Sequence, residues 1–246
     1  MKKQLMSALV LTAALGLAAT GAHADVYNFD DTWVDWPGYD STIPRDEYGT
    51  PNINSMDVTV EGGLLMGVAI NMRSDNRQTY DSLFINTSYD GSGSTIGTNW
   101  DDWDYLVRDG YGSGHEDTTV GNEAGNGAWS VDGAAWSSED GFLGYTMTTG
   151  SSVRKDNPNG IDSDYLTDPG MVFAVTYDAS TFTLSYTFGD GLALDGGFFV
   201  AYSPWCANDV IGGGGPAPVP EPATMLLFGT GLAGLVTVSR KRRKNS

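Results

Sequence analysis

The fold is decided by residues 171–188, which read MVFAVTYDASTFTLSYTF. From Phe182 to Phe188 the residues alternate between apolar and small polar types, and this period of two places the two kinds of side chain on opposite faces of a strand. A short polar segment, residues 178–180, separates this run from the apolar run before it. The stretch therefore predicts a β-hairpin with one face in a core and the other in solvent.

Similar short runs precede and follow this hairpin, separated by clusters of Gly, Asn, Asp and Ser. Glycine accounts for 33 of the 246 residues, nearly double the usual share of roughly 7%, which fits a chain with many turns. Between its two ends the chain has no segment with a convincing helical period. We therefore expect an all-β fold, a β-sandwich or jelly-roll-like domain. The other expected strands cover residues 57–60, 64–72, 82–87, 104–107, 141–148 and 197–202.

The charge of the chain is concentrated in its central part. Residues 25–222 contain all 31 acidic residues and six bases, a net charge of −25. Such a field repels nucleic acid, so we expect no nucleic-acid partner. We expect one acidic domain over residues 25–211, followed at residues 212–219 by a Gly/Pro-rich linker that is first flexible and then stiff.

The N-terminus has the pattern of a secretory signal peptide. Lys2 and Lys3 precede an apolar segment, and Ala22-His23-Ala24 provides a small-x-small cleavage site. We therefore expect residues 1–24 to be removed, with the Sec machinery and a signal peptidase as partners. The mature chain would begin at Asp25, on the exported side of a membrane.

The last 27 residues combine three features in a fixed order. The middle feature is an uncharged apolar run at residues 223–239, about as short as a membrane-crossing helix can be, since a hydrocarbon core of ~30 Å needs roughly 17–25 residues. The basic tail at residues 240–246 would stay in the cytoplasm. The pattern predicts one short C-terminal transmembrane helix. The feature before the apolar run is the tripeptide Pro220, Glu221 and Pro222. The feature after it is the group of bases Arg240, Lys241, Arg242 and Arg243.

This three-part tail resembles the PEP-CTERM sorting signal of Gram-negative bacteria. The resemblance implies that exosortase, a membrane-embedded enzyme, removes the helix from an inner-membrane-anchored precursor. It also implies transfer of the protein to the cell surface, the outer envelope or the extracellular polysaccharide. An ordinary C-terminal membrane anchor is the alternative, but an anchor has no need of the rigid, extended Pro-Glu-Pro.

The single cysteine, Cys206, excludes an intramolecular disulfide. Its thiol could pair between chains, act as a nucleophile or pack as a small apolar group. The sequence Cys206-Ala207-Asn208-Asp209 resembles a short block that often precedes Pro-Glu-Pro in the same family, with Ala207 in place of the commoner Gly. The resemblance implies a position for the block and no chemistry.

A carbohydrate site is one hypothesis for the acidic domain, because sugar sites combine aromatic ring faces with carboxylates. The alternative is that Trp103 and Tyr105, which would share one face of a strand, belong to the core. The candidate residues are Trp100, Trp103, Asp101, Asp102 and Asp104.

Calcium binding is a second hypothesis, because residues 156–164 are rich in oxygen ligands. Their spacing does not match an EF-hand loop, and a solvated turn is the alternative. No other cofactor is expected. The candidate ligands are Asp156, Asn159, Asp162 and Asp164.

Enzymatic activity has little support in the sequence. His115 is the only histidine of the mature chain, so a His-based metal cluster is excluded, and a nucleophile elbow is absent. We expect an exported protein without catalytic activity and with a structural or adhesive role. A carbohydrate- or calcium-binding module and a secreted glycan-active hydrolase are the alternatives.

Overall fold

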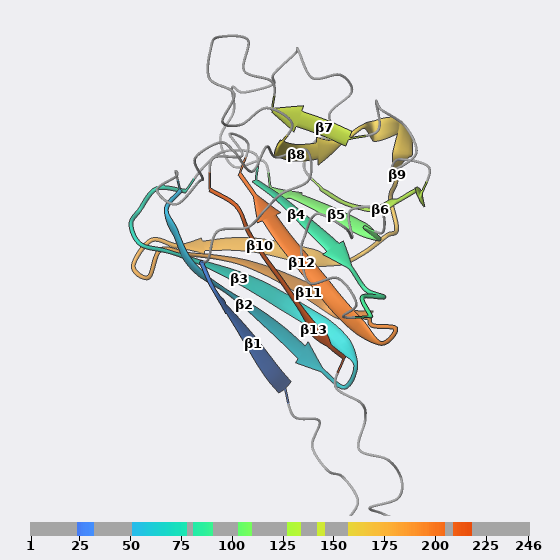
Figure 1. Cartoon of the computed structure of the whole chain (residues 1–246), viewed down its shortest axis with the longest axis horizontal. Coiled ribbons are helices and arrows are strands. Elements are labelled where there is room, and N and C mark those ends of the chain that lie inside the picture. Colours follow the sequence, from blue (N-terminus) through green and yellow to red (C-terminus); the bar gives the residue numbers. More distant parts are fainter. Residues whose placement is uncertain are drawn as a thin grey trace, which may run out of the picture. The chain divides into compact units, whose positions relative to one another are not determined.

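The computed structural model describes residues 24–31, 51–77, 81–90, 103–109, 127–133, 142–145, 157–204 and 209–217. These residues form two antiparallel sheets and a separate two-stranded sheet, which confirms the prediction of an all-β fold (Figure 1). No helix within the described residues is long and apolar enough to cross a membrane. The transmembrane helix predicted at residues 223–239 and the signal peptide predicted at residues 1–24 lie outside these ranges, except for Ala24.

The first sheet has five strands in the order β1-β2-β3-β11-β10. It contains two hairpins, β2-β3 and β10-β11, which are joined by the pairing of β3 with β11, and β1 pairs with β2 at the other edge. The strands are β1 (Ala24–Asp30), β2 (Ile53–Glu61), β3 (Leu64–Met72), β11 (Thr183–Ala193) and β10 (Phe173–Asp178).

The second sheet has six strands in the order β13-β12-β4-β5-β6-β9, and β7 and β8 pair separately. A 3-10 turn, η5 (Ser163–Tyr165), lies between β8 and β9. The six strands are β13 (Ile211–Pro216), β12 (Gly197–Ser203), β4 (Asp81–Asn86), β5 (Tyr105–Asp109), β6 (Gly127–Val131) and β9 (Leu166–Thr167); the separate pair is β7 (Phe142–Tyr145) and β8 (Asn157–Ile161).

The hairpin predicted at residues 171–188 is present as β10 and β11, with Phe173 opposite Phe188 and Tyr177 opposite Leu184. Its turn is stabilised by Asp178, whose carboxylate accepts hydrogen bonds from the Ser180 amide at 2.8 Å and hydroxyl at 2.6 Å. Such Asx turns satisfy backbone donors that a strand end leaves unpaired. The alternation of the sequence therefore reflects a sheet with one buried face.

The main core lies between the two sheets. The inward side chains of the five-stranded sheet, such as Val58 and Leu184, join those of the six-stranded sheet, such as Leu83 and Val200, in one buried cluster. Each of these four side chains is fully buried. The two sheets therefore pack face to face as a β-sandwich.

A second buried cluster covers the opposite face of the six-stranded sheet. Phe84, Leu106 and Ala201 point to this side, and Trp103 and Ile161 of β8 cover them. As a result β4 is buried along its whole length, whereas β10 alternates between exposed and half-buried residues. The strands buried on both faces lose the period-two pattern and have continuous apolar runs instead.

Candidate functional site

The strand that precedes the tail, β13, is the first element of the candidate site. It pairs with β12 from Tyr202 opposite Ile211 to Gly197 opposite Pro216, and the Ala217 amide donates to the Gly196 carbonyl at 3.1 Å. Ala217 is the last described residue. The flexible linker predicted at residues 212–219 is therefore wrong for residues 212–216, which form an edge strand.

Close packing of aromatic rings explains why this strand consists of glycine. A Cβ atom on Gly213 would overlap the Phe29 ring, one on Gly214 would lie 2.7 Å from Cδ2 of Phe199, and one on Gly215 would lie 3.0 Å from Cε1 of Tyr27. None of these glycines has a positive φ angle. They are required because backbone and rings approach closely, and not because the segment is flexible.

We call the rings around β13 the aromatic seam; its members are Tyr27 and Phe29 of β1, Phe198 and Phe199 of β12, and Tyr89. The Tyr27 and Phe198 ring centroids are 5.0 Å apart with an interplanar angle of 76°, an edge-to-face contact. Tyr89 and Phe199 pack in a similar way at 5.3 Å. The contact between Tyr27 and Phe198 thus holds the six-stranded sheet against β1 of the five-stranded sheet, whereas Phe199 packs with the cluster on the outer face.

The seam also brings the two ends of the domain together. The Tyr27 hydroxyl donates to the Pro216 carbonyl at 2.9 Å. Ala24, the residue before the predicted signal-peptide cleavage point, is already paired with Glu61 in β1. The start of β1 and the end of β13 consequently lie at the same end of the sandwich (Figure 1).

Asp209 anchors the segment that enters β13. Its side chain is 2% exposed, and its Oδ2 atom accepts a hydrogen bond of 2.6 Å from the Ile53 amide at the start of β2. A buried carboxylate bound in this way fixes the direction of the chain. The structure thus gives a positioning role to one residue of the Cys206–Asp209 block, while Cys206 itself lies outside the described residues.

Substitution of Gly213 by alanine should loosen the seam. We expect Gly213→Ala to lower the free energy of unfolding by about 2 kcal/mol, because overpacking costs roughly 1–3 kcal/mol. Urea unfolding of the compact unit Ala24–Pro218 measures the loss. Gly133→Ala is the matched control, because a Cβ there would have no atom within 4 Å. Equal losses in the two variants would contradict the explanation of the glycine strand.

The structure places the carbohydrate candidates differently from the prediction. Trp103 is 3% exposed, and its ring lies 5.6 Å from Phe84 and 5.8 Å from Phe199, centroid to centroid. Its face is covered by these rings, so in this structure Trp103 is a core residue and offers no stacking surface to a sugar. Trp100, Asp101 and Asp102 lie outside the described residues.

The prediction that Trp103 and Tyr105 share one face is also wrong. Trp103 packs in the cluster on the outer face of the six-stranded sheet, while Tyr105 packs against the core between the sheets. The reason is that the strand begins only at Tyr105, so the period of two does not extend back to Trp103. The burial of Trp103 nevertheless agrees with the alternative that this residue belongs to the core.

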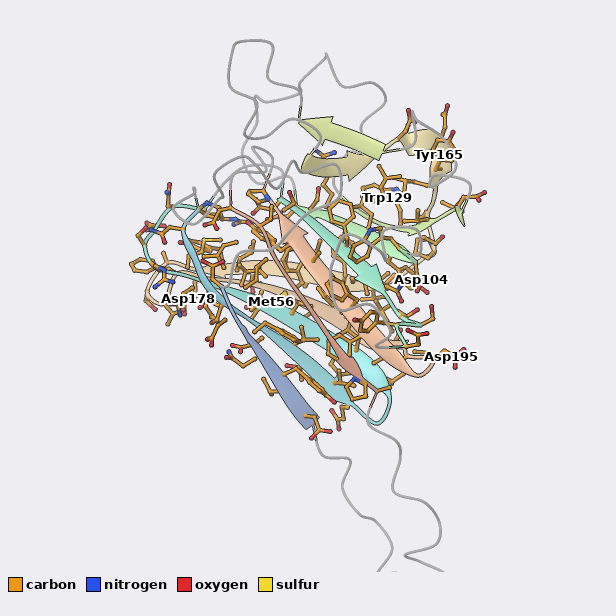
Figure 2. The ribbon with its side chains drawn as sticks, in the orientation of Figure 1. Met56, Asp104, Trp129, Tyr165, Asp178 and Asp195 are labelled. Atoms are coloured by element: carbon orange, nitrogen blue, oxygen red, sulfur yellow. The ribbon has the colours of Figure 1, made fainter. Side chains whose placement is uncertain are left out.

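Asp104 serves the fold as well. Its Oδ2 atom accepts hydrogen bonds from the amide and the hydroxyl of Thr87, both at 2.6 Å. The residue lies beside the end of β4, as Figure 2 shows. Its carboxylate therefore closes the end of that strand.

The calcium candidates fall on regular structure. Asn159 lies within β8, and Asp162 caps η5 by accepting a hydrogen bond from the Asp164 amide at 2.9 Å. The exposed residues Ser163 and Asp164 of η5 agree with the alternative of a solvated turn, whereas Asn159 belongs to a strand. Asp156 lies outside the described residues. Within the part of the chain that the structure describes, no three His, Cys, Asp or Glu side chains are grouped as metal ligands.

A buried charged cluster was not predicted from the sequence. Asp81, the first residue of β4, has no exposed surface, and Arg108 of the neighbouring strand β5 is 1% exposed. Tyr202 of β12 and Tyr186 of the facing sheet are buried beside them. Nearby, Arg77 forms an ion pair with Asp109 and lies over the Tyr177 ring at 5.4 Å.

Burial dominates the protonation of this cluster. It raises the pKa of Asp81 to about 7, although the nearby Tyr202 hydroxyl and the charges of Arg77 and Arg108 act in the opposite direction. Burial, followed by the charge of Asp81, also raises the pKa of Tyr186 well above its usual value. Shifts of this size often mark functional sites, but Asp81 is sealed from solutes in this structure. The protonation of the buried Asp81 therefore affects the stability of the folded domain.

A small pocket of about 190 Å³ opens between the sheets near the start of β10. Tyr105, Phe188 and Leu192 contribute to its lining together with Asp190. Val172 also lines the pocket and is 65% exposed. Among the described residues, this pocket combines an aromatic ring and a carboxylate, the two kinds of group that a sugar site requires.

The geometry defines an all-β domain whose last strand runs directly into a C-terminal signal. A family model for the PEP-CTERM protein-sorting motif matches residues 218–243, beginning at the residue after Ala217. The chain therefore carries a PEP-CTERM protein-sorting motif at its C-terminal end. The motif implies an exosortase-sorted, exported protein with a membrane-anchored precursor in a Gram-negative bacterium. No curated protein and no solved structure matches the chain.

Proposed function

We propose that the chain is a non-catalytic protein of the cell surface or the extracellular polysaccharide, with a structural or adhesive role. The Sec machinery and signal peptidase produce a precursor beginning at Asp25. The apolar residues 223–239 then span the inner membrane, with the basic tail in the cytoplasm. Exosortase recognises Pro220, Glu221 and Pro222, removes the helix and releases the domain. No cofactor is required for this role.

One observation carries this proposal: the matched sorting motif begins at Pro218, directly after the end of the folded domain. A domain delivered in this way needs to be soluble, which its net charge of −25 favours. Several described carboxylates have structural roles, since Asp81 and Asp209 are buried and Asp104 binds Thr87. These assignments leave such groups unavailable for catalysis and support the non-catalytic role.

Replacing Pro220, Glu221 and Pro222 by alanine should abolish processing. We expect the uncleaved chain to accumulate in the membrane fraction, because the enzyme loses the rigid, extended tripeptide that it recognises. Pulse-chase immunoblotting of membrane and surface fractions measures the effect. Alanine substitutions at Thr224 and Thr230 are the control, because they leave the tripeptide and the apolar character of the helix intact. Normal processing of the triple variant would sink the proposal.

A further inference from the structure

The sorting signal leaves the domain through a strand of unusual composition. Between Gly212 and Gly215, β13 carries no side chain, and only one strand, β12, pairs with it in the six-stranded sheet. Detaching this segment breaks a single ladder and gives its glycines a large gain in backbone entropy. An ordinary edge strand would also have to withdraw its own apolar side chains from the core.

The two ends of this strand are held very differently. At its start, Ile211 is fully buried and Asp209 binds the Ile53 amide at 2.6 Å. At its end, Pro216 is exposed, and the Tyr27 hydroxyl binds its carbonyl at 2.9 Å. The end next to the sorting signal is therefore the weakly held one, while the start is anchored in the core.

The length of free chain limits access to the signal. When β13 is docked, Pro220 is the third residue after Ala217, a span of about 10 Å at full extension. A peptidase needs its substrate as an extended chain, and proteolysis of a folded protein usually proceeds through a locally opened state. Detachment from Gly212 onward adds six residues, or about 20 Å of extended chain.

We propose that residues 212–217 form a strap whose detachment from the aromatic seam controls processing of the sorting signal. Docked, the strap keeps the chain before the signal paired with β12 and slows the enzyme. Detached, it supplies the extended chain that the enzyme binds, while the anchor at Asp209 and Ile211 keeps the rest of the domain folded. This inference rests on the proposed processing by exosortase and adds a structural control of its rate.

The test uses the full-length chain in a host that carries the processing enzyme, with the rate followed by pulse-chase. Tyr27→Phe removes only the hydroxyl that holds Pro216, so we expect processing about two- to ten-fold faster, the effect of losing one hydrogen bond. Gly213→Ala, which forces the strap away from Phe29, should act in the same direction. Because Tyr27→Phe keeps the ring, it remains informative if Gly213→Ala does not fold.

Two further variants distinguish detachment of the strap from a general loss of stability of the domain. Leu184→Ala weakens the core at β11, which β2 and β3 separate from β1 in the five-stranded sheet, and we expect it to leave the processing rate unchanged. A Gly-Ser spacer of about eight residues between Ala217 and Pro218, long enough to replace the strap's reach, should speed processing and remove the difference between Tyr27→Phe and the unaltered chain. Unchanged rates in Tyr27→Phe and in the spacer chain would overturn the strap, and equal acceleration by Leu184→Ala would overturn it too.

The outcomes also distinguish this inference from the function on which it rests. If alanines at Pro220, Glu221 and Pro222 leave processing intact, the sorting function itself fails. If those alanines stop processing while Tyr27→Phe and the spacer change nothing, the function stands and only the strap is wrong.

Discussion

Trp103→Ala should destabilise the compact unit Ala24–Pro218 by about 3–5 kcal/mol, the usual cost of removing a buried tryptophan or phenylalanine. The residue is 3% exposed and packs between the rings of Phe84 and Phe199. Its removal leaves a cavity on the outer face of the six-stranded sheet, where Ile161 and Val210 complete the cluster. Urea unfolding followed by far-UV circular dichroism measures the loss.

Trp103→Phe is the matched control for this experiment, because it keeps an aromatic ring in the same cluster. We expect it to recover at least half of the lost stability. The pair of variants also decides between the two roles considered for Trp103. An unchanged stability of Trp103→Ala, combined with loss of binding to a polysaccharide, would restore the stacking role and contradict the burial of the ring.

The strands that the sequence predicted best are those of the sheet with one open face. The β10 and β11 hairpin was readable because Leu184 and Tyr186 enter the core while Ser185 and Thr187 do not. The run predicted at residues 64–72 coincides with β3. In these strands burial on one face imposes the period of two directly on the sequence.

The strand β13 was missed for a physical reason. Glycine has no side chain and therefore gives no pattern, and the information that makes Gly213 a strand residue lies in Phe29, far away in the sequence. The strand β1 did carry a signal, because Tyr27 and Phe29 alternate with the polar residues Asn28 and Asp30. That signal was obscured by its position directly after the apparent signal peptide.

The candidate sites also differ in whether they could be predicted from the sequence. The sorting signal was readable in full because its three features are contiguous in the chain, and a family model matches it at residues 218–243. The buried cluster was not readable, because nothing next to Asp81 in the sequence marks an aspartate as buried. Its environment comes from Arg108 and Tyr202, on two other strands.

The buried Asp81 should make the stability of the domain depend on pH. Its pKa is about 7 in the folded chain, compared with the ordinary value of 3.8. The folded state therefore keeps a proton that the unfolded chain releases. This contribution to stability is fully present below pH 3.8 and is lost as the pH rises through about 7. Since one pKa unit corresponds to about 1.4 kcal/mol, the total loss is about 4 kcal/mol.

Asp81→Asn isolates this effect, because asparagine has nearly the same size and no proton to lose. We expect the stability advantage of the unaltered domain over Asp81→Asn to shrink by about 4 kcal/mol between pH 4 and pH 7.5. Urea unfolding at a series of pH values measures it. Asp195→Asn, on an exposed turn, controls for the general titration of this acidic domain. A difference between unaltered domain and Asp81→Asn that stays constant with pH would show that Asp81 ionises normally. In that case the interior around Arg108 and Tyr202 would have to admit water, and burial would not raise the pKa of Asp81.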